Sequence, residues 1–321
     1  MKATFDPLVS IIIPVYNGSN YMREAIDSAL NQSYKKIEIL VINDGSNDDD
    51  KTEEIALSYG DKIRYLKKEN GGVSSALNLG IREMKGQYFS WLSHDDVYLP
   101  NKIEKQVDML KSHDNENLIC YCNDEKIDKN SQPISVKKSF KGFQNGEVSE
   151  WYSVMQHLFK NGALNGCGLL IPRKIFIENN LLFDETMKYA QDALMWYLIF
   201  LNKYSLVYVD NIGVKNRIHE KQLTQTGKNL YKKDVLSIAK IIKPLLIEYD
   251  NKKNDLLFLY LRRNAKQGNK EVIKYFYKDR DCCSKLTVSR KMNIFFIGIY
   301  GKIRPTVRRL YYKMFVKVKT N

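Results

Sequence analysis

Short apolar runs rich in β-branched residues alternate with amphipathic stretches over the first 123 residues of the chain. The strand-like runs lie at 9–14, 37–43, 63–67, 88–93 and 118–122, and helical stretches lie at 20–31, 50–59, 72–84 and 101–112. This alternation is typical of a mostly parallel sheet whose faces are covered by helices. Asn20 and Asp50 are suitable N-caps, and Gly86 stands where a glycine is expected after a helix. The sequence therefore predicts an α/β fold with a Rossmann-like, nucleotide-binding type of sheet.

The later part of the chain has a different pattern. Residues 123–146 are polar and rich in Lys, Asp, Asn and Ser, which predicts a mobile excursion from the core. Regular structure resumes with a helix at 151–160, a strand at 168–172, a helix at 192–202 and a strand at 206–209. From about Asn229 the pattern is helical to the end. We expect an α/β domain at 1–228 and a C-terminal helical extension at 229–321.

The composition excludes several classes of protein. The chain has 321 residues, of which 44% are hydrophobic, enough for a sizeable core. Its five cysteines form no CxxC pairs or His-spaced clusters, which argues against a disulfide framework and a zinc site. The first apolar run is too short for a signal peptide, and the longest late run, 293–300, falls well short of the ~20 residues of a spanning helix. We expect a cytoplasmic protein with free thiols.

Charge is concentrated at the C-terminal end. The net charge is +14, and the segment 285–321 contains no Asp or Glu but ten Lys and Arg residues, interleaved with apolar and aromatic ones. Basic residues mixed with apolar and aromatic ones suit an interfacial segment on an anionic membrane surface. The same pattern also fits a tail helix whose apolar face packs on the core. Both interpretations are favoured over a nucleic-acid patch, so we expect no nucleic-acid partner.

Polar residues follow the first three predicted strands at the point where each strand ends. Carboxyl ends of strands form the ligand crevice in an open α/β sheet. An aromatic ring there can stack on a base, a carboxylate can accept from a nucleobase imide or a ribose hydroxyl, and a glycine pair at a helix start lets the backbone approach a ligand. Each tip alone is equally compatible with a simple turn. The residues concerned are Pro14, Val15, Tyr16, Asn17, Asp44, Asn70 and Gly71.

The fourth strand ends in two adjacent carboxylates, Asp95 and Asp96, preceded by Ser93 and His94. Hard carboxylate oxygens at this edge suit Mg²⁺ or Mn²⁺ carrying a substrate diphosphate. The alternative is that the two acids turn the chain and cap the next helix. Four successive strand tips with ligand-type residues favour a binding edge.

Six segments, in this order and spacing, resemble the family 2 glycosyltransferases, which are inverting enzymes with the nucleotide-sugar-binding GT-A fold. The resemblance covers roughly residues 8–219. The segments are SIIIPVYN at 10–17, VINDGS at 41–46, NGGVSSALNLGI at 70–81, KGQYFSWLSHDD at 85–96, QDALMW at 191–196 and RIH at 217–219.

The resemblance implies roles for several residues. Pro14, Val15, Tyr16 and Asp44 would hold the nucleoside, most often uridine. Asp95 would ligate the metal that bridges the diphosphate. Asp192 would be the catalytic base, a role compatible with its other interpretation as the N-cap of the following helix.

The Arg-x-His element and two departures complete the expected site. His219 would coordinate the metal through a neutral imidazole or contact phosphate when protonated, and Arg217 would pair with phosphate oxygens. Ser93 stands where the family commonly has an acid, so ligation must rest on Asp95, with Asp96 or His94 beside it. Gln191 stands where Glu is frequent. The small residues of 164–168 predict room for a sugar on the acceptor side, or a tight turn into a strand.

We therefore expect an inverting, Mn²⁺- or Mg²⁺-dependent glycosyltransferase. It would move one sugar from a nucleotide-sugar donor, a UDP-sugar, to a hydroxyl of a glycan or lipid-linked glycan in the synthesis of a bacterial-type surface polysaccharide such as capsule, O-antigen or exopolysaccharide. The tail at 285–321 would bring it peripherally to the inner face of the plasma membrane. The rival hypotheses are a sugar nucleotidyltransferase, which lacks support because no glycine-rich basic N-terminal loop is present, and a non-catalytic anion-binding module.

Overall fold

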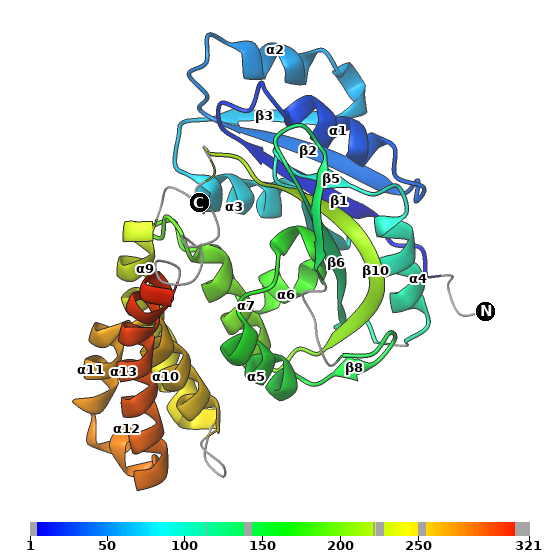
Figure 1. Cartoon of the computed structure of the whole chain (residues 1–321). Helices are drawn as coiled ribbons and strands as arrows, with labels where there is room; N and C mark the ends of the chain where they lie inside the picture. The colour runs from blue at the N-terminus through cyan, green and yellow to red at the C-terminus, as the bar shows by residue number, and fades with distance from the viewer. Residues whose placement is uncertain are drawn as a thin grey trace. The chain divides into compact units, whose positions relative to one another are not determined.

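The computed structural model describes residues 5–113, 115–137, 143–220, 222, 228–249 and 255–311, with side chains placed up to residue 299. Residue contacts divide the chain into two units (Figure 1). Unit 1 comprises Met1–Val154 and Ala163–Leu230, and unit 2 comprises Met155–Gly162 and Tyr231–Asn321. The division in the second half falls close to the expected boundary at 228. The short segment Met155–Gly162, which joins unit 2, was not expected there.

Unit 1 is built on one ten-stranded sheet with the order β3-β2-β1-β4-β9-β6-β10-β5, with β7 paired to β6 and β8 to β10. β1 pairs in parallel with β2 and β4, β2 with β3, and β6 with β10, whereas β9 is antiparallel to both β4 and β6. This is the predicted mixed α/β sheet with mostly parallel strands. The strands are β1 Val9–Val15, β2 Ile37–Asp44, β3 Arg64–Lys68, β4 Tyr88–Trp91, β5 Val97–Tyr98, β6 Ile119–Ile127, β7 Pro133–Lys137, β8 Val148–Ser149, β9 Leu169–Pro172 and β10 Leu206–Arg217.

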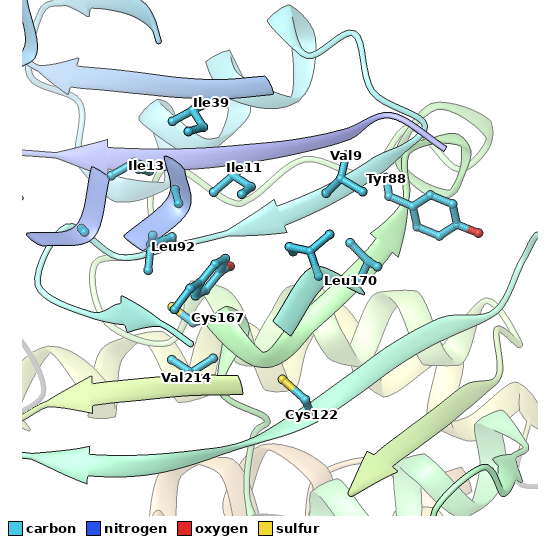
Figure 2. Packing of buried hydrophobic residues seen from close by; sticks show 14 of the residues in the cluster. Val9, Ile11, Ile13, Ile39, Tyr88, Leu92, Cys122, Cys167, Leu170 and Val214 are labelled. Carbon is cyan, nitrogen blue, oxygen red and sulfur yellow. The ribbon is translucent and has the colours of Figure 1, made fainter. Parts of the chain in front are cut away.

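Helices cover both faces of this sheet, which is why its central strands read as continuous apolar runs. All seven residues of β1 are buried. Ile11 and Ile13 belong to one core cluster with the buried faces of α1 and α4, part of which Figure 2 shows. Ile12 points to the other face, where a Cβ on Gly80 of α3 would lie only 2.5 Å from its Cγ2. The helices of unit 1 are α1 Met22–Leu30, α2 Lys51–Leu57, α3 Val73–Glu83, α4 Lys102–Lys111, the start of α5 Trp151–Asn161, α6 Arg173–Glu178 and α7 Gln191–Leu201.

The expected excursion at 123–146 is wrong in its first part. β6 continues to Ile127, and β7 pairs with it as an antiparallel hairpin. The polar residues of β6 are accommodated because they have partners: the Asn123 amide donates to the Tyr208 hydroxyl and, at 3.3 Å, to Asp210. A buried polar side chain with hydrogen bonds is compatible with a central strand. Residues 138–142 lie outside the described residues.

The predicted helix ends also need correction. α1 starts at Met22 with Tyr21 as N-cap, and Asp50 precedes α2 without a side-chain cap bond. Asp48 serves α2 instead, because its carboxylate accepts from the Thr52 hydroxyl at 2.7 Å and from the Thr52 amide at 3.3 Å. Gly86 is needed for a close approach and not for a helix end, since a Cβ there would lie 2.7 Å from the Leu8 carbonyl oxygen.

Unit 2 is helical. Tyr260 of α10 lies at its centre, with ring centroids 5.2 Å from Phe159 of α5 and 5.6 Å from Phe276 of α11. α10 packs along α13. Within the described part of the chain, no helix has an apolar stretch long enough to cross a membrane. The elements of this unit, besides the end of α5, are α9 Lys228–Tyr249, α10 Asp255–Gln267, α11 Lys270–Tyr277, α12 Arg280–Ser284 and α13 Val288–Tyr311.

Candidate active site

The tip of β1 is tied to the loop after β2. Pro14 and Val15 end the strand, and Asn17 adopts a positive φ of 49°. The Asn17 amide nitrogen donates to Ser46 Oγ at 2.9 Å, and its side chain exchanges hydrogen bonds with Asn47 at 2.7 and 2.8 Å. The Tyr16 ring is 43% exposed, and its hydroxyl donates to Asn47 Oδ1 at 3.3 Å. An exposed aromatic face therefore stands on an anchored turn at the carboxyl edge of the sheet.

Asp44 binds the tip of β2 to the loop that enters α3. Its carboxylate is buried and accepts from the amides of Gly71 at 3.0 Å and Gly72 at 2.7 Å, and from Lys68 Nζ at 2.8 Å. The Asn70 side chain donates to the Asp44 carbonyl at 3.0 Å. The structure thus brings together the residues predicted at the second and third tips. It also shows that the Asp44 carboxylate fixes this loop, with Lys68 as a partner that the sequence reasoning missed.

The fourth tip lies against the first. After β4 the chain turns, with the Asp96 amide donating to the Ser93 carbonyl at 3.0 Å. The His94 ring is hydrogen-bonded to the Pro14 carbonyl, and burial lowers the pKa of His94 while the neighbouring Asp95 charge acts in the opposite direction. A Cβ on Gly18 would lie 2.8 Å from the His94 ring. The tips of β1 and β4 are therefore in contact, and the His94 ring packs between them.

Asp95 and His219 form the candidate metal-binding pair. Asp95 Oδ2 lies 3.0 Å from His219 Nε2 and accepts from Gln222 Nε2 at 3.3 Å. A carboxylate oxygen and an imidazole nitrogen are ligands that Mn²⁺ accepts. No set of three His, Cys, Asp or Glu side chains in the described ranges is arranged to hold a metal. The residues fit a cation whose remaining ligands come from a diphosphate or water.

Asp96 is turned toward different partners. It is 2% exposed, and its carboxylate accepts from the Arg217 amide at 2.9 Å, the Asn216 side chain at 3.2 Å and the Cys167 thiol at 3.4 Å. Burial, together with the negative charge of Asp95, raises the pKa of Asp96. Asp96 therefore holds the end of β10 through these hydrogen bonds, and its contact with the donor stays a prediction.

Arg217 has several protein partners in this structure, and its role as a phosphate ligand stays a prediction. Its side chain is 1% exposed and donates to Glu24 at 2.5 Å, to Ser131 Oγ at 2.9 Å and to the Asp95 carbonyl at 2.8 Å. The guanidinium also lies 4.5 Å from the centre of the Tyr21 ring. Its hydrogen bonds thus join α1, the β6–β7 hairpin and the backbone of the turn that carries Asp95. Sequence reasoning missed Glu24 and Ser131, because no local pattern links them to a residue so far along the chain.

Asp192 lies in the first turn of α7. The N-cap is Ala190, so the alternative role of Asp192 as N-cap is wrong, although its Oδ1 accepts from the Ala193 amide at 2.7 Å. Burial raises the pKa of Asp192 to about 6. The loop before α7 contacts the third strand tip, because Lys188 Nζ donates to the Gly71 carbonyl at 3.4 Å. A carboxylate with a pKa near 6 is suited to accept a proton at neutral pH.

Of the two alternatives for 164–168, the structure shows the tight turn into a strand, because the short helical turn Gly166–Gly168 leads directly into β9. Gly166 leaves room there for two aromatic rings. A Cβ there would lie 2.5 Å from Trp91 and 3.2 Å from Trp196. Trp196 therefore holds α7 close to the end of β4. A hollow of about 390 Å³ lies elsewhere, between α4 and β10, with Lys105 and Asp210 among its lining residues. None of the predicted site residues lines it.

The chain belongs to glycosyltransferase family 2. Residues 10–164 match the family model described as glycosyl transferase family 2. An uncharacterized glycosyltransferase of Rickettsia typhi (strain ATCC VR-144 / Wilmington) is 51% identical over 226 residues, which are 70% of this chain and 69% of that protein. The minor teichoic acid biosynthesis protein GgaB of Bacillus subtilis (strain 168) is 28% identical over 78% of this chain, but the match spans only 28% of GgaB.

Solved structures define the fold. S. aureus TarS superimposes with a TM-score of 0.66 at 16% identity, over 91% of this chain and 53% of TarS. TarS 1–349 in complex with UDP-GlcNAc matches with a TM-score of 0.65 at 16% identity, over 91% of this chain and 81% of the other. The fold of the chain is thus of the GT-A type, as predicted, followed by C-terminal helices.

Proposed function

We propose that this glycosyltransferase moves a single sugar, with inversion, from a UDP-sugar to a hydroxyl of a glycan or lipid-linked glycan during synthesis of a bacterial-type surface polysaccharide. The observation that carries the proposal is the Asp95–His219 pair, held beside strand tips that carry an exposed Tyr16 ring and the anchored Gly71 loop. The relatives support the donor and product classes. GgaB is named for teichoic acid biosynthesis, a chondroitin synthase of Pasteurella multocida is 29% identical over 65% of this chain, and TarS has been crystallised with UDP-GlcNAc.

The donor would be held by its nucleoside and by its diphosphate. The Tyr16 face offers a stacking surface for the base, and the short hydrogen bonds of Asp44 keep the Gly71–Gly72 backbone at the edge of the site. Asp95 and His219 would hold Mn²⁺ or Mg²⁺, which supplies Lewis-acid stabilisation of the leaving diphosphate. Arg217 holds the Asp95 backbone, because its side chain donates to the Asp95 carbonyl. Asp96 in turn holds Arg217 by accepting from its amide.

The acceptor would be activated by Asp192. Its carboxylate takes the proton of the acceptor hydroxyl while the acceptor oxygen bonds to C1 of the sugar and the C1–O bond to the diphosphate breaks, with its electron pair going to the diphosphate. Attack from the face opposite the leaving group inverts C1. A pKa of about 6 keeps Asp192 ionised at neutral pH yet basic enough to accept the proton.

The test is UDP release from a panel of UDP-sugars with Mn²⁺. We expect release with at least one donor, its loss in Asp95→Ala, and its loss in Asp192→Asn with donor binding preserved in calorimetry. Asp61→Asn, at an exposed acid of the short helical turn Gly60–Lys62, is the matched control and should retain activity.

Three results would contradict the proposal in whole or in part. A sugar nucleotidyltransferase would release pyrophosphate from a nucleoside triphosphate and a sugar phosphate, and a binding module would release no UDP from any donor. Unchanged turnover in Asp192→Asn would remove Asp192 as the base. With a lipid-linked acceptor, the proposed reaction would take place at the membrane surface, for which we propose the inner face of the plasma membrane.

A further inference from the structure

One face of α13 presents a continuous row of apolar side chains to solvent. Val288 is 77% exposed, Met292 47%, Phe295 60%, Phe296 57% and Ile299 37%. At about 100° per residue these five positions fall within an arc of about 100° on the helix. They form the α13 apolar face.

The opposite face of α13 is already packed within unit 2. Ile294 is 2% exposed, and a Cβ on Gly298 would come within 3.9 Å of Ala265 in α10. Arg290 forms an ion pair with Asp255, and its guanidinium lies 5.2 Å from the centre of the Phe258 ring. The helix is therefore fixed in rotation by α10, and the α13 apolar face is the side left outward. The interpretation of the tail as a packed helix therefore applies to the side of α13 that faces α10.

The charge around this face has a single sign. The segment 285–321 carries ten Lys and Arg residues and no acid. Lys291 lies beside the arc in the helical register. Arg290 is paired with Asp255 on the packed side, and Lys285 donates to the Ile247 carbonyl. The other seven cations follow from Lys302 onward, where side chains are outside the described part. Two copies of such a segment would repel each other, whereas a surface of anionic headgroups would attract it.

We propose that the α13 apolar face docks on an anionic lipid bilayer, with the helix lying in the plane of the interface. Phe295 and Phe296, which neighbour each other with ring centroids 5.6 Å apart, would enter the boundary between headgroups and acyl chains. The basic residues would contact the headgroups. This inference goes beyond the proposed reaction and does not depend on it.

The test is flotation of the full chain with vesicles of phosphatidylcholine and with vesicles of phosphatidylcholine mixed with phosphatidylglycerol. We expect flotation on the mixed vesicles only, weakened by high salt because the Debye length shortens. The double variant Phe295→Ser, Phe296→Ser should lower the partition coefficient by about tenfold or more, because two large apolar side chains no longer leave water. The matched control is Leu57→Ser, Ile177→Ser, which changes two apolar residues of unit 1 that are 60% and 62% exposed. It should float like the unchanged protein.

Each alternative outcome overturns the inference. These outcomes are no flotation of the unchanged protein on mixed vesicles, equal losses in the test and control variants, or flotation that does not depend on phosphatidylglycerol. A dimer in sedimentation velocity that the Phe295→Ser, Phe296→Ser variant converts to monomer, without vesicle binding, would assign the face to a second copy. UDP release is measured on the same preparations. Its absence would refute the proposed reaction and leave the membrane result standing.

Discussion

Asp192→Asn is expected to stabilise the fold while it abolishes turnover. The substitution replaces a carboxylate with a neutral amide of nearly the same shape, whose oxygen can still accept from the Ala193 amide. Burial raises the pKa of the Asp192 carboxyl from 3.8 to about 6 in the folded protein. Between these values the folded state binds more protons than the unfolded state, so the free energy of unfolding falls as pH rises. Above about pH 6 the carboxyl is ionised in both states, so its effect on the free energy of unfolding no longer changes with pH.

The magnitude follows from the two pKa values. At about 1.36 kcal/mol per pKa unit, the ionised carboxylate destabilises the fold by at most about 3 kcal/mol at neutral pH. Asp192 is partly exposed, so solvent screening reduces this to about 1–2 kcal/mol. Asp192→Asn removes this destabilisation. For a domain of this size the melting temperature should then rise by a few degrees at pH 7.5, and the gain should disappear at pH 4.

The assay is thermal unfolding of the unchanged protein, Asp192→Asn and the control Asp61→Asn over pH 4–8. The difference in melting temperature between Asp192→Asn and the unchanged protein should grow from about pH 4 to about pH 6 and then level off, while Asp61→Asn stays flat. Turnover of the unchanged protein should fall below about pH 6, as its base becomes protonated. A melting difference that is independent of pH, or that grows toward acid, would refute the reasoning, because the carboxylate would then not be held in a desolvating site.

Three further outcomes are expected. Asp95→Ala should lower Mn²⁺-stimulated UDP release by about a hundredfold or more, and addition of a chelator to the unchanged protein should have a similar effect, both measured by coupled UDP assay. Arg217→Lys should lower the free energy of unfolding by about 2–3 kcal/mol, because one ammonium cannot donate to Glu24, Ser131 and the Asp95 carbonyl together. Urea titration measures this change, and an unchanged midpoint of unfolding would contradict the positioning role of Arg217. Gly166→Ala should lower the free energy of unfolding by about 1–3 kcal/mol, because the added Cβ clashes with Trp91. Gly298→Ala in α13, where a Cβ has ordinary contacts, should raise the free energy of unfolding by up to about 1 kcal/mol. Equal melting temperatures of the two variants would count against this packing.

Local patterns were sufficient to predict the central strands of the sheet and several of its helices. Strands β1, β2 and β4 read as apolar runs because helices cover both of their faces, and period-3.6 stretches between them gave α1, α3 and α4. β7 and the end of β6 were missed because their sequence is polar. Their place in the sheet depends on distant partners, such as the Tyr208 hydroxyl for Asn123, and no local pattern contains such partners.

The positions of the candidate site residues could be predicted where they follow from the direction of the parallel strands. They could not be predicted where they depend on packing against distant parts of the chain. Parallel strands bring their carboxyl ends to one edge, so the residues at the tips of β1, β2 and β4 meet, as expected. Sequence spacing cannot say which of these residues face a ligand. Asp44 accepts from the loop amides of Gly71 and Gly72, and Arg217 pairs with Glu24, and neither partner is visible in the local sequence.

Asp95 and Asp96 show why the adjacent acids take different roles. Two carboxylates on neighbouring residues of one turn repel each other when no cation lies between them, and turning one of them away or neutralising it relieves this repulsion. Here Asp96 is turned to the amide of Arg217 and to the Asn216 side chain, and its raised pKa records both its burial and the charge of Asp95. Arg217 in turn donates to the Asp95 carbonyl, so the buried acid and the buried arginine together fix the direction of the outward acid. The second aspartate therefore contributes to the proposed metal site by orienting the first, and a conservative Asp96→Asn change should preserve this orientation better than Asp96→Ala does.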